Sequence, residues 1–381
     1  MLSERVFTVK SFLRTPLIFC LVLALTGCTL PEVTPLPSPS TDSQPTSTAP
    51  VVPTAIPPTE TSVSINEVIT LQNAASLKTI ARSANSNVQM MAWSLDSQSI
   101  TLISQNSNDS GSQVFGAASL QVPTLNPGFV WAAPSGSRIL GASPDGTTLA
   151  VLSNDSNTVA LVNGTSGKTL QNITPGFLVE YGSFSPDGKT LALTAHEEWK
   201  VKLYLVESGE EKATLTGFDT AAPVFDAGFA GNNQWIVWHA RGTLQVQNAE
   251  TKALGIAINQ EDSVSAFTVS ADGALLASAA GKTLSGVFKP VVSIWNVESG
   301  APIRDLLLEN AATALSFSPD GKLLAVAEGN VIQIWDVANE AVITSLGDNP
   351  NPVYRLAFSP DGKMLASSGN DNELILWAVG K

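Results

Sequence analysis

The chain contains 381 residues, and its 20 Lys and Arg against 33 Asp and Glu give a formal net charge of −13. Only 14% of the residues are charged, well below the roughly 25% of an average soluble domain, and 44% are apolar, which excludes a charge-rich disordered chain and a coiled coil. The acidic balance argues against nucleic-acid binding, which needs a basic surface. Two Cys and two His are too few for a disulfide scaffold or a zinc site built from these ligands.

Residues 1–27 are typical of a secretion signal, because basic residues precede an apolar stretch over residues 16–25. This stretch is shorter than the about 20 residues that span a bilayer. It ends in Leu25-Thr26-Gly27-Cys28, which resembles the lipobox of bacterial lipoprotein precursors. The resemblance implies cleavage before Cys28, lipid attachment to Cys28 and a position on the extracytoplasmic face of a bacterial membrane. An ordinary signal peptide and a retained apolar anchor are the alternatives.

Residues 28–66 are predicted to be the lipidated Cys followed by a tether. Nine of the 34 residues from Thr29 to Ser62 are Pro, and most of the others are Thr or Ser. Such a composition buries little apolar surface and favours extended polyproline II, with a reach of roughly 100 Å at ~3.1 Å per residue. We expect this segment to hold the following domain, residues 67–381, away from the membrane.

A single pattern recurs along that domain: an apolar run, a Ser-Pro-Asp-Gly turn or a degenerate form of it, and a second apolar run. The Pro and Gly suit the backbone angles of a hairpin turn, so each copy predicts two short strands. Third-strand patterns such as residues 331–336 and fourth-strand patterns such as Ala341–Leu346 follow. The turns repeat every 40 to 49 residues, at Asp96, Asp145, Asp187, Asn232, Asp272, Asp320 and Asp361. Seven units of four strands predict an all-β, seven-bladed β-propeller.

The last blade is expected to take its fourth strand from the other end of the domain. The chain ends at Lys381, directly after a third-strand pattern, whereas residues 75–81 match a fourth strand and precede the first unit. A strand from residues 75–81 would therefore pair into the last blade and close the ring, which removes exposed sheet edges.

The repeats resemble the WD40 family in their Ser-Pro-Asp-Gly turns and in Trp295, Trp335 and Trp377 at the ends of third strands. The resemblance implies a propeller that acts as a non-enzymatic, protein-binding scaffold. The family's Gly-His dipeptide is absent, so its buried Asp–His–Ser–Trp hydrogen-bond network is not expected to form. A TolB-like propeller with similar turns is the alternative.

The sequence offers little for catalysis. It contains no Gly-x-Ser-x-Gly, phosphate-binding Gly loop or His-Glu-x-x-His motif. His196 and His239 are the only imidazoles and are expected in solvent-facing connections between second and third strands. A metal site formed with Glu197 and Glu198 is the alternative. The repeated Asp and Trp residues are assigned to turns and to packing between blades. We therefore predict no enzyme activity, no catalytic residue, no metal and no cofactor.

Binding is better supported by two irregular segments, residues 125–134 and 280–290, which we expect to be loops on the face that carries both His residues. A partner-binding patch is predicted there from aromatic and basic residues: Phe129, Trp131, Trp199, Phe218, Lys282, Phe288 and Lys289. The sequence thus predicts a monomeric, lipid-anchored, extracytoplasmic scaffold that binds protein partners and no nucleic acid. The alternative is a TolB-like, sugar-binding or hydrolytic propeller that uses its central channel.

Overall fold

The computed structural model describes most of the chain from residue 65 onward and a short piece before it. The described residues are 54–55, 65–84, 87–107, 113–194, 200–216, 226–229, 235–240, 243–260, 262–369 and 373–380. The chain divides into two units, Met1–Thr48 and Ala49–Lys381, and all described residues belong to the second unit. Within these ranges the only helix is the short 3-10 helix η1 (Ala74–Ser76), and no helix is long and apolar enough to cross a membrane.

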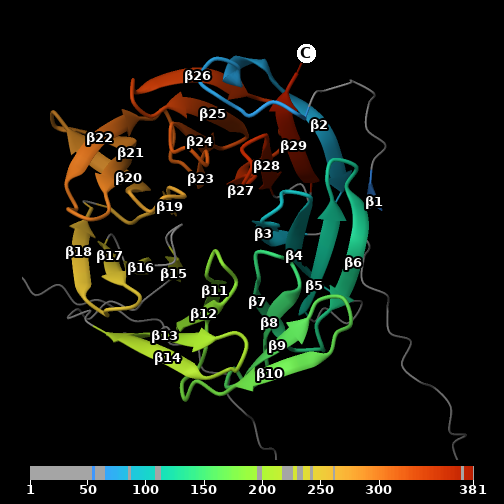
Figure 1. The fold of residues 1–381 in the computed structure, drawn as a ribbon. Helices are drawn as coiled ribbons and strands as arrows, with labels where there is room; N and C mark the ends of the chain where they lie inside the picture. The colour runs from blue at the N-terminus through green and yellow to red at the C-terminus, as the bar shows by residue number, and fades with distance from the viewer. Residues whose placement is uncertain are drawn as a thin grey trace, which may run out of the picture. The chain divides into compact units, whose positions relative to one another are not determined.

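The described residues form seven antiparallel sheets arranged in a ring, so the predicted all-β, seven-bladed β-propeller is confirmed (Figure 1). The strands of each blade follow one another from the centre of the ring outward. Blade 1 contains β3 (Val88–Trp93), β4 (Ser99–Ser107), β5 (Gln113–Gln121) and β6 (Asn126–Ala132); blade 2 contains β7 (Arg138–Ala142), β8 (Thr148–Leu152), β9 (Val159–Asn163) and β10 (Thr169–Ile173); and blade 3 contains β11 (Tyr181–Phe184), β12 (Thr190–Thr194), β13 (Lys200–Leu205) and β14 (Glu211–Thr216). Blade 4 contains β15 (Asp226–Phe229), β16 (Trp235–Ala240), β17 (Thr243–Asn248) and β18 (Leu254–Asn259); blade 5 contains β19 (Ala266–Val269), β20 (Leu275–Leu284), β21 (Val287–Asn296) and β22 (Pro302–Leu307); and blade 6 contains β23 (Ala314–Phe317), β24 (Leu323–Glu328), β25 (Val331–Asp336) and β26 (Ala341–Leu346).

Blade 7 combines strands from both ends of the domain. It contains β27 (Val353–Phe358), β28 (Met364–Gly369), β29 (Glu373–Val379) and β2 (Leu77–Ala84), and β2 pairs with β29 along its length. The predicted closing strand is therefore confirmed, two to three residues further along the chain than expected. A fifth strand, β1 (Thr54–Ala55), pairs with the end of β2, although these two residues fall within the segment predicted to be a tether.

The hydrophobic core is divided among the contacts between blades. The second strands are apolar on both faces, and every residue of β8, β12 and β24 is buried because each strand lies between two neighbouring sheets. In the described part of the chain the buried apolar side chains form seven clusters, one between each pair of neighbouring blades. The outer strands, such as β10 and β26, are largely exposed.

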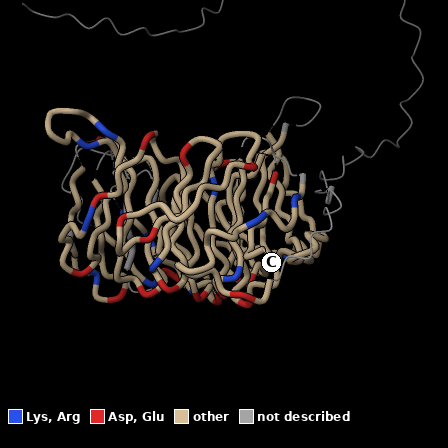
Figure 2. The backbone as a smooth tube through the Cα atoms, turned by 90° about the horizontal axis from the view of Figure 1, so that it is seen from above, with Lys and Arg blue, Asp and Glu red and all other residues tan. Residues whose placement is uncertain are grey.

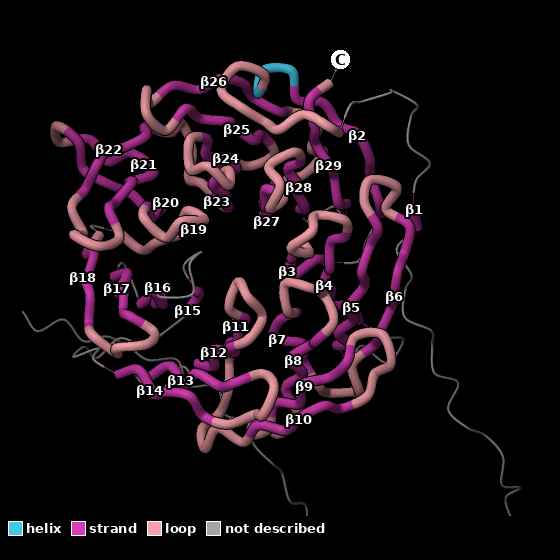
Figure 3. Tube along the Cα trace, in the orientation of Figure 1, coloured by secondary structure: helices cyan, strands magenta, loops and turns pink. Residues whose placement is uncertain are grey.

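The connections between strands define two faces of the ring (Figure 3). We call the face with the connections between first and second strands and between third and fourth strands the turn face. The opposite face carries the connections between second and third strands and between successive blades. Figure 2 shows acidic residues concentrated along the edge formed by the turn face, whereas one long hairpin projects from the opposite face.

Candidate functional site

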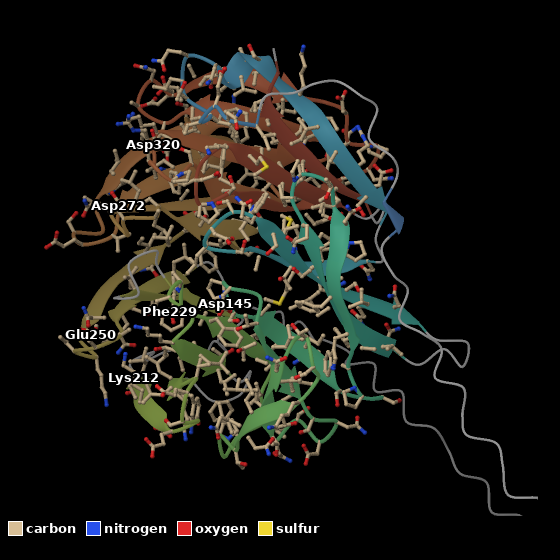
Figure 4. All side chains as sticks on the ribbon, turned by 45° about the vertical axis from the view of Figure 1, so that its right-hand side comes forward. Asp145, Lys212, Phe229, Glu250, Asp272 and Asp320 are labelled. Atoms are coloured by element: carbon tan, nitrogen blue, oxygen red, sulfur yellow. The ribbon has the colours of Figure 1, made fainter. Side chains whose placement is uncertain are left out.

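The turn face is built from one repeated hydrogen-bonded turn. In blade 5 the Ser270 hydroxyl donates to the Asp272 carboxylate (2.6 Å), which accepts the main-chain N–H of Ala274 (2.9 Å), while the Ser270 oxygen accepts the N–H of Leu275 (2.9 Å). Gly273 has a φ of +74°, which favours glycine. The same Ser–Asp arrangement recurs at Asp96, Asp145, Asp187, Asp320 and Asp361. These carboxylates therefore close turns, as predicted, and Asp272 and Asp320 lie along one edge of the ring (Figure 4).

These hydrogen bonds also stabilise the charged form of the carboxylates. The Ser94 hydroxyl holds the pKa of Asp96 below its ordinary value, and the Ser270 hydroxyl does the same for Asp272. At Asp145 and Asp320 burial opposes the effect, but hydrogen bonds from serine hydroxyls and main-chain amides still lower the pKa. Groups held in the charged form by their own turn are suited to a structural role and unsuited to proton transfer near neutral pH.

Two blades contain a different buried tryptophan network, in which a side-chain amide takes part and no histidine does. In blade 7 the Trp377 indole N–H donates to Ser367 Oγ (2.9 Å), and the Ser367 hydroxyl donates to Asn349 Oδ1 (3.1 Å). In blade 5 the Trp295 indole N–H donates to Ser278 Oγ (2.8 Å), which also contacts the Gln260 amide. In blades 5 and 7, a side-chain amide from the connection before the blade thus takes the place of the histidine imidazole of the family's network.

The opposite face contains a large cavity, of about 920 Å³. It opens beside the channel at blades 1 to 3 and is lined from β3, β7 and β11, from the facing ends of β4 and β5, and from the β8–β9 connection. Met90 and Tyr181 contribute apolar and aromatic surface, whereas Gln105 and Gln113 contribute amides. A second cavity, of about 350 Å³, lies between the inner strands of blades 5 to 7, and Arg355 lines both. A cavity of this size and mixed lining is typical of a ligand-binding or peptide-binding site.

The charged groups that line the larger cavity are Arg138, Arg355 and Glu180. The Arg138 guanidinium donates to the main-chain oxygen of Glu180, while Arg355 donates through Nε to the main-chain oxygen of Gln89 (2.6 Å) and through Nη1 to its neighbour's carbonyl (2.8 Å). These carbonyl contacts fix the two guanidinium groups in position. The lining thus contains two basic side chains and one acidic side chain in a strongly acidic chain.

Phe129 and Trp131 lie on β6, the outer strand of blade 1, and not in the loop predicted from the sequence. Both are half-buried against the cluster between blades 1 and 2. A Cβ at Gly167 would come within 2.7 Å of Trp131 Nε1, and one at Gly164 within 3.0 Å of Phe129 Cζ, so the two rings pack closely against the β9–β10 turn. Trp131 also lines a recess of about 220 Å³ between these blades. Their visible role is packing, and their binding role stays a prediction.

The segment around Lys282, Phe288 and Lys289 is likewise an extension of β20 and β21, and not an irregular loop. Phe288 is 61% exposed, and Lys282 forms an ion pair with Asp305 (2.6 Å). Cys28, Trp199, Phe218 and His196 lie outside the described residues. The five described residues of the predicted patch are divided between blades 1 and 5, and its binding role stays a prediction.

None of the residues that line the larger cavity is His, Cys or Asp. Among the described residues no three His, Cys, Asp or Glu side chains are placed to hold a metal ion. His239 lies on β16, where its backbone pairs with Asp226 and Leu244.

Comparison with known proteins supports the fold. The family model "WD domain, G-beta repeat" matches residues 308–336 and 341–378, which contain the strands β23 to β25 of blade 6, β26 and the strands β27 to β29 of blade 7. No curated protein shows significant similarity to the chain. WD40 propellers generally mediate protein–protein interactions and are typically non-enzymatic. The chain is thus a seven-bladed β-propeller whose last two blades contain segments that match the WD40 repeat.

Proposed function

We propose that the chain is a lipid-anchored, extracytoplasmic scaffold without enzyme activity, which binds a segment of a partner protein in the large cavity of the opposite face. The sequence Leu25-Thr26-Gly27-Cys28 and the Pro-rich residues that follow support the anchor and the position outside the membrane. The propeller fold supports a role in protein interaction in general terms, and the size and lining of the cavity support it as the site that binds the partner segment.

The observation that carries the proposal is the cavity of about 920 Å³ between blades 1 and 3. Its volume is larger than a single small-molecule ring would fill. Its lining combines apolar side chains with amides and two guanidinium groups. An extended peptide presents apolar side chains and main-chain carbonyl groups together, and both find counterparts here. The basic side chains further favour a segment that carries a carboxylate.

The test is site-specific crosslinking in the native cell. A photo-reactive amino acid replaces Tyr181, which is 41% exposed and lines the cavity, or Leu95, which is 58% exposed in a turn of the turn face. We expect a discrete crosslinked protein from position 181 and none from position 95. Equal crosslinking at both positions, or none at 181 in cells that contain the folded protein, would contradict the proposed site.

The anchor has its own test. The Cys28→Ala variant should not be labelled when cells are grown with a labelled fatty acid. Its chain should either leave the membrane fraction or remain there with an uncleaved signal sequence. The wild-type chain should incorporate the labelled fatty acid. A Cys28→Ala variant that is labelled as strongly as the wild type would contradict lipid attachment at Cys28 while leaving the cavity proposal intact.

A further inference from the structure

The hairpin formed by β20 and β21 extends far beyond its sheet. The first strand of blade 5 pairs with β20 only as far as Ala279, and the outer strand pairs with β21 from Val291 onward. The two long strands continue to pair with each other up to Leu284 and Val287. Residues 280–290 are therefore a two-stranded ribbon, and it is the hairpin that projects from the opposite face (Figure 2).

The tip of this ribbon is apolar on both of its faces. Ser285 (φ +50°) and Gly286 (φ +80°) form a two-residue turn between Leu284 and Val287, whose side chains share one face. Phe288 lies on the other face, where a Cβ at Gly281 would come within 1.9 Å of its ring, so the ring covers the glycine. Val287 is 55% exposed and Phe288 61% exposed, which places both among the most exposed large apolar side chains of the described residues.

The charge of the ribbon differs from that of the rest of the chain. Residues 275–296 contain Lys282 and Lys289 and no acidic residue, although the whole chain has a net charge of −13. Lys282 pairs with Asp305 of the neighbouring strand, whereas Lys289 has no ion pair among the described residues. Lys282 and Lys289 stand opposite each other on the two strands of the ribbon, directly behind the apolar tip.

We propose that this tip inserts into the interfacial region of a bilayer that contains anionic lipids. Leu284, Val287 and Phe288 enter the boundary between headgroups and acyl chains, and Lys289 meets the lipid phosphates. A flat protein surface would cover one face of the ribbon and leave the other in water. A bilayer surrounds the tip on both sides, which fits its two apolar faces. The proposal does not depend on the anchor at Cys28 or on the partner site.

Contact at blade 5 would also orient the ring. The large cavity lies at blades 1 to 3, across the ring from blade 5. A ring held at the membrane by the blade 5 hairpin is tilted, so the cavity remains accessible to a partner on the same side of the membrane. The anchor alone would allow the ring to take any orientation.

The test places an environment-sensitive fluorophore at the tip of the full chain. Cys20 and Cys28 are replaced by Ser, and a single cysteine at Val287→Cys is labelled with a nitrobenzoxadiazole probe. We expect a blue shift and a rise in intensity with vesicles of phosphatidylcholine and phosphatidylglycerol, and quenching by spin-labelled lipids. The matched control is the same probe at Leu95→Cys, an equally exposed apolar position on the turn face, which should stay in water. This control also separates tip insertion from vesicle binding by the apolar residues 16–25.

Two variants of the labelled chain sharpen the result. Phe288→Ser should weaken vesicle binding at the tip about tenfold, because one large apolar side chain is removed. Lys289→Gln should weaken it about fivefold with anionic vesicles and leave binding to pure phosphatidylcholine unchanged. A probe at position 287 that responds no more than the probe at position 95 would overturn the proposal. A probe whose fluorescence does not change with vesicles but shifts to the blue with envelope proteins would also overturn the proposal. That result would assign the tip to a protein partner.

Discussion

Blades 7 and 1 are neighbours with the same order of strands, but they fill one equivalent interior position in different ways. In blade 7 Trp377 stands opposite Leu365, and its indole bonds to Ser367. In blade 1 Leu120 stands opposite Ile100, and Leu102 occupies the place of that serine. Both Trp377 and Leu120 are at most 1% exposed.

This difference separates the requirements of the fold from those of the family signature. The position between two blades must be filled by a large side chain, and either an indole or an isobutyl group does so. The hydrogen bonds of Trp377 are an addition that blade 1 lacks. The family model accordingly matches residues of blade 7 and none of blade 1, although both blades have the same architecture.

The largest expected effect tests whether the two blades depend equally on filled volume. Trp377→Ala should lower the free energy of unfolding by about 3–5 kcal/mol and Leu120→Ala by about 2–5 kcal/mol, because each leaves a cavity between blades. Urea unfolding followed by circular dichroism measures both. A loss below about 1 kcal/mol for Leu120→Ala would show that blade 1 tolerates an empty position, and the equivalence would fail.

The next effect isolates the hydrogen bonds that only blade 7 has. Ser367→Ala removes a partner from both the Trp377 indole and Asn349, so it should cost about 1–3 kcal/mol of unfolding free energy. The matched control is Ser368→Ala in the same strand. Ser368 is equally buried, but its hydroxyl has no hydrogen-bond partner in the described structure, so this change should cost little.

A double-mutant cycle completes that test. Trp377→Phe keeps most of the volume but removes the indole N–H, and its effect should overlap with that of Ser367→Ala. Strictly additive losses in the double variant would show that the two side chains act independently, against the network described for blade 7.

The smallest effect concerns the turn that both blades share, and it depends on pH. In the folded chain the Ser94 hydroxyl and the Gln98 amide lower the pKa of Asp96. The unfolded chain therefore binds a proton more readily, so this carboxylate stabilises the fold above the ordinary Asp pKa of about 3.9 and ceases to do so as the pH falls through its folded value. The stabilities of wild type and Asp96→Asn should differ at pH 7 and should begin to converge only as the pH falls below about 4. A difference that stays constant from pH 7 to pH 3 would contradict this origin.

Most of the fold could be predicted from the sequence because its signals are local and repeated. The Ser-Pro-Asp-Gly turns and the doubly apolar second strands specify hairpins between neighbouring sheets, and the closing strand has the same pattern as other fourth strands. The partners of Trp377 and Trp295 could not be predicted in this way. Asn349 and Gln260 lie in connections whose path depends on the assembled ring, so no local pattern marks them as substitutes for histidine.

The secondary structure of the predicted site differed from the expectation, for a physical reason that is visible in blade 1. Asn126-Pro127-Gly128 is typical of a turn, but these residues begin β6. An outer edge strand tolerates proline, because its missing N–H faces away from the sheet. Phe129 and Trp131 were therefore predicted in a loop and lie in a strand. The large cavity could not be predicted from the sequence, because its lining comes from three blades and from Arg355 of blade 7.

The pairing of β2 with β29 has a mechanical consequence. In a chain anchored at its N-terminus, as proposed here, any tension between the membrane and a bound partner enters the ring through β1 and β2. The load falls first on the two residue pairs of β1 and then on the seven pairs that join β2 to the last strand. The strand that closes the ring is thus also the strand that carries the mechanical load. Separation of β2 from β29 would open the ring within blade 7.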